Sequence, residues 1–88
     1  MANHKSALKR IRQSEKRRQR NKAIRSSVRT ELNKFHKALE AEDVEAATEA
    51  FRDAESALDV AASKGVIPKK RAARKTGRLA KHLHALKS

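Results

Sequence analysis

The sequence predicts an all-α protein, a three-helix bundle with a long N-terminal helix projecting beyond the bundle. Helix breakers are rare, since the 88 residues include one proline and two glycines. Residues that favour helix, such as Ala, Leu, Lys, Arg and Glu, dominate the chain. Apolar residues recur at steps of three and four, and no sustained alternation marks a strand. A chain of this length forms a single domain, residues 1–88, with a limited core.

The first helix is expected over about residues 5–40. Its core-facing stripe follows steps of four, four, three and four, at Ile24, Val28, Leu32, Phe35 and Leu39. Toward the N-terminus the same stripe continues as Asn21, Arg17, Ser14 and Arg10. The apolar seam therefore ends near Ile24 while nothing stops the helix, so its N-terminal part should project. Leu8 and Ile11 lie off the stripe, either in a local contact or exposed.

The second helix is expected over about residues 44–63, after a turn at 40–43 in which Asp43 is a plausible N-cap. Its predicted seam consists of Val44, Ala47, Phe51, Ala54, Leu58 and Ala61. The opposite side is acidic, with Glu42, Glu45, Glu49, Asp53 and Asp59. We interpret that side as facing solvent, away from any polyanion, in preference to a docking site for a basic partner. Lys64 and Gly65 form a typical C-terminal signal, after which Val66 and Ile67 can fold back.

The third helix is expected over about residues 68–86, with Pro68 at its first position, where the missing N–H is not needed. Its inner seam consists of Ala72, Thr76, Leu79, Leu83 and Leu86. Gly77 lies inside this helix and should weaken it by about 1 kcal/mol relative to alanine. Basic residues spread over its other face: Lys70, Arg71, Arg74, Lys75, Arg78 and Lys81.

Charge is distributed in three blocks within a total of +13. Residues 1–37 carry thirteen Lys and Arg against two acids, residues 38–63 carry eight acids against Arg52, and residues 64–88 carry nine basic residues and no acid. This magnitude predicts a polyanionic partner. The first block is the densest, and its charges surround the helix axis: Lys9, Arg10, Arg12, Lys16, Arg17, Arg18, Arg20, Lys22 and Arg25. An ordinary solvated face would have an uncharged opposite side, so nucleic acid is favoured.

Structured RNA is the nucleic acid that the residues favour. The chain has no Trp or Tyr, and both phenylalanines lie on inner seams, so it has no stacking platform for single strands. It also has neither zinc-finger spacing nor a zipper after the basic region. Recognition of backbone and shape remains, which is typical of folded RNA. The basic face of the third helix is the second such surface. Polar residues among the cations can donate hydrogen bonds to phosphate or ribose, although each can equally be an ordinary surface residue.

Other classes of function fit less well. The chain lacks cysteine, and its histidines have no metal-binding spacing, so neither a metal site nor a cofactor is expected. No nucleophile elbow, glycine-rich phosphate loop or carboxylate pair indicates an enzyme. No apolar run approaches membrane-spanning length, and no signal peptide is evident, so we expect a cytoplasmic protein. A DNA packager would share the charge, and a membrane-active basic helix would need a broad apolar face that is missing here.

Two stretches of the sequence are similar to one known family. NHKSALKRIRQSEKRRQRNKAIRSSVRT near the start and KGVIPKKRAARKTGRLAKHLHAL at the end resemble the bacterial small-subunit ribosomal protein numbered twenty. The likeness covers nearly the whole chain, but residues 34–53 match only in character. Leu8 departs from it, standing where the family has a basic residue, which puts a phosphate contact there in doubt.

The resemblance implies a three-helix bundle that binds small-subunit ribosomal RNA directly, early in assembly. It places the first helix among RNA helices of the 5′ domain and near the long penultimate helix toward the 3′ end, with other small-subunit proteins only as neighbours. No membrane or small-molecule ligand is expected. By this analogy, the predicted RNA-binding residues are Lys5, Ser6, Lys9, Arg10, Arg12, Gln13, Ser14, Lys16, Arg17, Arg18, Arg20, Asn21, Lys22, Arg25, Arg29, Lys69, Lys70, Arg71, Arg74, Lys75, Arg78 and Lys81.

Overall fold

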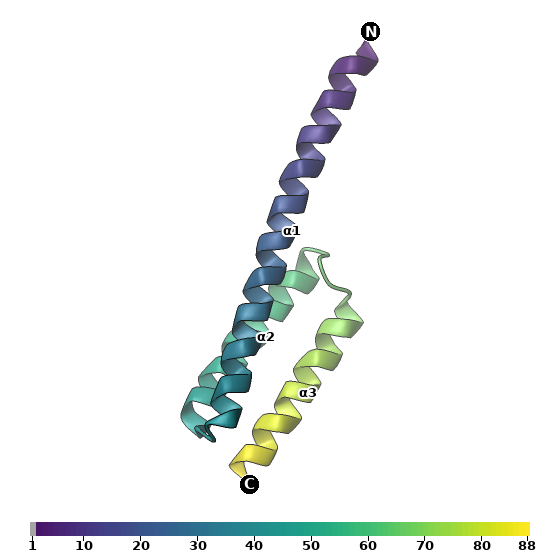
Figure 1. The fold of residues 1–88 in the computed structure, drawn as a ribbon. Coiled ribbons are helices and arrows are strands. Elements are labelled where there is room, and N and C mark those ends of the chain that lie inside the picture. The colour runs from purple at the N-terminus through teal and green to yellow at the C-terminus, as the bar shows by residue number, and fades with distance from the viewer. Residues whose placement is uncertain (1) are drawn as a thin grey trace.

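Three helices make up the described part of the chain. The computed structural model describes the backbone of residues 2–88 and the side chains of residues 7–88. Within this range the helices are α1 (Ala2–Glu40), α2 (Val44–Ser63) and α3 (Lys69–Lys87), joined by short turns (Figure 1). The molecule is elongated, with principal extents of 67 × 22 × 13 Å. The predicted all-α fold with a long first helix is confirmed, and α1 begins at Ala2, earlier than expected.

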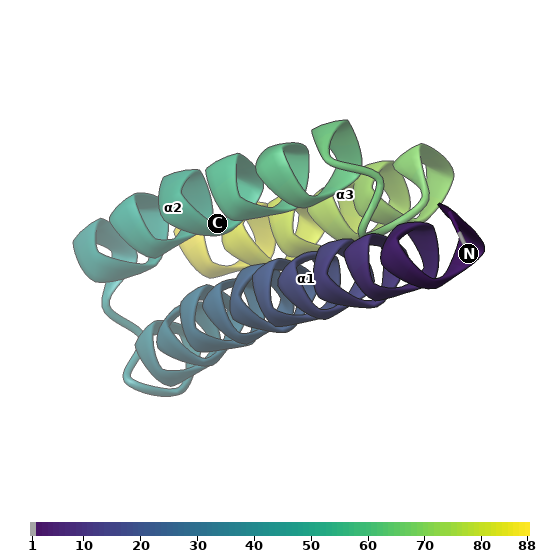
Figure 2. The same cartoon turned by 90° about the horizontal axis from the view of Figure 1, so that it is seen from above.

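The second helix holds the other two together. α2 packs along both α1 and α3, whereas α1 and α3 have few contacts with each other. Figure 2 shows the three helices from above, with α2 running alongside α1. One apolar cluster fills the space between the helices, and its fully buried large side chain is Phe35. The Phe35 ring lies against Phe51 of α2, with 6.2 Å between the ring centroids. Both phenylalanines therefore serve packing, as their positions on the seams predict.

Only the C-terminal half of α1 belongs to this core. Val28 and Phe35 are buried, and Ile24, Leu32 and Leu39 are half-buried against the cluster. The residues from 7 to 20 are all exposed. In Figure 1 the purple and blue turns of α1 extend well past the loop that joins α2 to α3. The apolar stripe thus ends near Ile24 while the helix continues, as predicted.

The ends of α2 use the capping residues that the sequence indicates. The Asp43 side chain accepts a hydrogen bond from the Ala46 N–H at 3.1 Å. At the other end Gly65 adopts a φ of 75°, and its N–H donates to the Ala62 carbonyl. The Val66 N–H donates to the Ala61 carbonyl at 2.9 Å, which completes a Schellman motif. Val66 then packs against the core together with Ile67, as expected.

Two local predictions were wrong. Pro68 is the N-cap of α3 and not its first helical residue, and its carbonyl accepts from the Ala72 N–H at 3.0 Å. Val44 does not lie on the α2 seam and is 38% exposed. Ala50 is buried instead, because the buried row follows Ala47, Ala50, Ala54, Leu58 and Ala61.

Candidate nucleic-acid interface

The N-terminal half of α1 forms a rod of exposed side chains outside the bundle. We define the projecting segment as residues 7–23, in which Asn21 is half-buried and all other side chains are exposed. Its eight cations are Lys9, Arg10, Arg12, Lys16, Arg17, Arg18, Arg20 and Lys22. At 3.6 residues per turn these positions lie on every side of the axis. A ligand can therefore meet positive charge from more than one direction.

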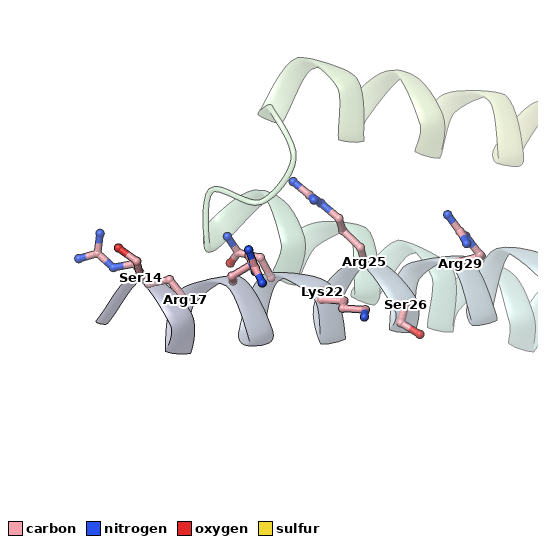
Figure 3. A pocket seen from close by; sticks show the side chains of 8 residues that line it. Ser14, Arg17, Lys22, Arg25, Ser26 and Arg29 are labelled. Atoms are coloured by element: carbon pink, nitrogen blue, oxygen red, sulfur yellow. The ribbon is translucent and has the colours of Figure 1, made fainter. Parts of the chain in front are cut away.

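A shallow groove runs along this segment and continues onto the start of the bundle. It is lined by Ser14, Arg17, Arg18, Asn21, Lys22, Arg25, Ser26 and Arg29. These residues form two rows at steps of four along α1, with the groove between them. In Figure 3, Arg25 and Arg29 point to the side on which the α2–α3 loop and α3 lie. Lys22 and Ser26 point away from that side, so the groove presents cations along both of its edges.

Acidic residues neutralise little of this charge. Among side chains 7–88 two ion pairs are present, Arg18 with Glu15 at 4.0 Å and Lys34 with Glu31 at 3.7 Å. The pair in the projecting segment is exposed, so it contributes at most about 1 kcal/mol. The other cations of the segment repel one another along the helix, and like charges one turn apart destabilise it.

α3 presents the second basic surface. Lys69, Lys70, Arg71, Arg74, Arg78 and Lys81 are exposed, and Lys75 is half-buried. The core side of the helix is formed by Ala72, Leu79 and Leu83, which are buried. The predicted residue Thr76 is half-buried on the same side. The basic residues are thus held on the outside of α3 by the packing of its apolar side.

The outer side of α2 has the opposite charge. Glu45, Glu49, Asp53 and Asp59 are all exposed, and Arg52 is the single basic residue of this helix. A polyanion is repelled by this side. The molecule therefore has two basic surfaces, on α1 and α3, and one acidic surface, on the helix that joins them in the core.

Asn21 marks the boundary between the projecting segment and the bundle. It is half-buried one turn before Ile24, and its Oδ1 is buried with no hydrogen-bond partner. A buried polar atom without a partner destabilises the fold. The stripe position at Asn21 is therefore already polar, although α1 still lies close to the rest of the bundle there.

Most of the predicted site residues lie on the two basic surfaces. Lys5 and Ser6 lie outside the described side chains. The groove adds Ser26, which the sequence placed among the polar residues able to donate hydrogen bonds but not in the predicted RNA-binding set, although it lies one turn after Lys22 on the same row. Its place four residues after a predicted site residue was the available signal.

The described residues contain no group of three or more His, Cys, Asp or Glu side chains placed to hold a metal ion. None of the helices in the described part of the chain is both long and apolar enough to cross a bilayer.

Comparison with known proteins gives one consistent family. A family model described as ribosomal protein S20 matches residues 2–84. The small ribosomal subunit protein bS20 of Salinispora tropica is 54% identical over 83 residues, which are 94% of this chain and 94% of that protein. The bS20 protein of Cutibacterium acnes is 52% identical over 98% of each chain. That of Geobacillus thermodenitrificans is 50% identical over 100% of this chain and 99% of its own length.

Proposed function

The chain belongs to the ribosomal protein S20 family, and on that premise we propose that it binds small-subunit ribosomal RNA directly and stabilises the RNA fold during assembly. The family is one of structural ribosomal components, so the protein is a constituent of the ribosome and not an enzyme. It acts in the cytoplasm, where ribosomes work.

The projecting segment is the observation that carries this proposal. All of its side chains except Asn21 are exposed, and its cations lie on every side of the helix axis. A bundle of this size does not need such an extension for its own stability, since the core begins near Ile24. Phosphates on several sides of the helix would remove its internal repulsion. A helix of this kind suits a position between RNA segments that lie close together.

The contacts follow from the chemistry of each side chain. Lys and Arg neutralise phosphates, and Arg can do so with two parallel hydrogen bonds. Ser, Gln and Asn side chains on α1 bond phosphate or ribose oxygens. The residues proposed on α1 are Lys5, Ser6, Lys9, Arg10, Arg12, Gln13, Ser14, Lys16, Arg17, Arg18, Arg20, Asn21, Lys22, Arg25 and Arg29. Those proposed on α3 are Lys69, Lys70, Arg71, Arg74, Lys75, Arg78 and Lys81.

In this proposal, specificity for one RNA fold comes from the arrangement of the two basic surfaces in space. Phosphate contacts position a protein without reading bases, so the relative placement of two basic surfaces selects the RNA fold that fits both. The acidic side of α2 supports this by repelling RNA from the third side of the molecule. The RNA regions proposed are the 5′ domain and the long penultimate helix near the 3′ end.

Salt dependence tests the electrostatic part of the proposal. Binding to a 5′-domain transcript should be measured from about 50 to 200 mM salt. A protein that neutralises about six to ten phosphates loses roughly 10³- to 10⁵-fold in affinity over that range, because bound counterions are released. A flat response would contradict the proposal. Duplex DNA of equal length serves as competitor, and a preference for DNA would favour a DNA-packaging function instead.

A further inference from the structure

Gly77 lies near the middle of α3 in an ordinary helical conformation. Gly65 at the end of α2 needs its positive φ of 75°, but Gly77 has none. Any L residue can adopt the backbone conformation at position 77. Glycine inside a helix lowers stability relative to alanine, because the unfolded chain gains conformational freedom. The backbone of the protein therefore does not require this residue.

Packing within the described protein does not require it either. A Cβ atom added at Gly77 would have no neighbour within 4 Å beyond the adjacent residues and the nearby backbone of α3 itself. The position is exposed, on the side of α3 away from the buried Ala72, Leu79 and Leu83. Glycine also lets a ligand or another backbone approach a chain closely. None of the described parts of the protein outside α3 fills the space at Gly77, so the position is open to such an approach.

The surroundings of Gly77 identify the chemistry of that ligand. Arg74 and Lys81 lie one turn before and one turn after it, at spacings of three and four that bring them to the same side of the helix. Both side chains are exposed, and the chain carries no acid after Asp59. The open backbone at Gly77 is therefore flanked by cations, as suits a phosphate-bearing strand.

We propose that the RNA backbone passes closest to α3 at Gly77, and that a small residue here sets how near Arg74 and Lys81 come to the phosphates. This inference rests on the proposed function, because the ligand is the RNA that the α3 surface binds. With no side chain in the way, a ribose–phosphate segment can lie directly on the helix. A long side chain would hold the strand away and weaken both charge interactions, since Coulomb attraction falls with distance.

Two substitutions at the same position test this inference. Gly77→Ala and Gly77→Gln both favour helix, so each should raise the thermal midpoint, by about 4–8 °C for alanine. Affinity for a 5′-domain transcript at constant salt should fall about tenfold or more for Gly77→Gln and by less for Gly77→Ala, because only the long side chain separates strand from helix. Val60→Gln, which adds a similar side chain to an exposed position of α2, should leave affinity unchanged.

Each alternative outcome has a defined meaning. Unchanged affinity for Gly77→Gln would overturn the inference, and so would a lower thermal midpoint for Gly77→Ala, which would show that the fold itself needs glycine. The double variant Arg74→Gln/Lys81→Gln separates this failure from failure of the proposed function. If only the double variant loses affinity, α3 binds RNA but the close approach is wrong. If neither variant loses affinity, the α3 part of the proposed function is wrong as well.

Discussion

Residues 24–40 and residues 7–23 are consecutive parts of one helix, α1, but they differ in what surrounds them. The C-terminal part places Val28, Phe35 and Ala38 in the core, each less than 10% exposed. The N-terminal part has Leu8 and Ile11 as its large apolar residues, at 49% and 59% exposed. Burial of apolar side chains stabilises the helix in residues 24–40. In residues 7–23 the cations outnumber the acids, and their repulsion destabilises the helix.

This difference teaches that a continuous helix can have two separate sources of stability. Most helical stability in proteins comes from packing an apolar side, and intrinsic propensity alone is marginal in water. The projecting segment lacks such a side, so its helix should depend on a polyanion that reduces the repulsion. The boundary near Asn21 and Ile24 is then a change of function as well as of burial.

The largest expected effect comes from removing charge in the projecting segment. The variant Arg10→Gln/Arg17→Gln/Arg18→Gln/Arg20→Gln keeps helix propensity but loses four proposed phosphate contacts. The slope of log affinity against log salt should fall in magnitude by about 3, at roughly 0.7–0.9 per contact, and affinity should fall about 100-fold or more. Filter binding or fluorescence anisotropy on a 5′-domain transcript measures both quantities.

A matched control removes four positive charges elsewhere. Lys37, Arg52, Lys64 and Lys87 are exposed and lie outside the proposed RNA-binding set. Changing all four to Gln gives the same net charge as the variant above. We expect a much smaller loss of affinity, arising only from the long-range field. An equal loss in the two variants would show that net charge matters and that the projecting segment has no special role.

The next effect compares apolar truncations in the two parts of α1. Phe35→Ala removes a ring with 0% exposure and should lower the free energy of unfolding by about 3–5 kcal/mol, enough to leave much of so small a domain unfolded. Ile11→Ala should change it by no more than about 0.5 kcal/mol, since its side chain is largely exposed. Circular dichroism with denaturant titration measures both. A large destabilisation by Ile11→Ala would mean that the projecting segment contacts the bundle.

A smaller expected change in stability tests where the boundary between the projecting segment and the bundle lies. Asn21→Leu removes the buried Oδ1 that lacks a partner and extends the apolar stripe by one turn. The free energy of unfolding should rise by about 1 kcal/mol. Ser14→Leu makes a polar-to-apolar change on the same stripe at an exposed position and should give no such gain. Equal stability changes for the two variants would place the boundary elsewhere.

Sequence reasoning reached the features that depend on local chemistry. Asp43 as a cap, Gly65 at the end of α2 and the stripe from Ile24 to Leu39 all follow from residue type and spacing, and the structure confirms them. The sequence did not predict the features that depend on how the helices are rotated against each other. Ala50 is buried in place of Val44, because contacts with both neighbours, and not hydrophobicity alone, orient α2.

The candidate site was also predictable only in part. Charge density alone indicated α1 and α3, and the cations of these helices within residues 7–88 are exposed as expected, apart from the half-buried Lys75. The weak contact between α1 and α3 could not be foreseen, because apolar stripes do not specify which pairs of helices touch. Nor did spacing predict that Asn21 is partly enclosed, since that depends on where the bundle ends along α1.

Hydrogen exchange of the protein with and without RNA tests the central claim most directly. In the free protein, amides of residues 7–20 should exchange quickly and those of residues 28–39 slowly, because only the latter belong to the packed core. Adding a 5′-domain transcript should slow exchange in residues 7–20. Strong protection of residues 7–20 in the free protein, or no added protection with RNA, would contradict the division of α1 at Ile24.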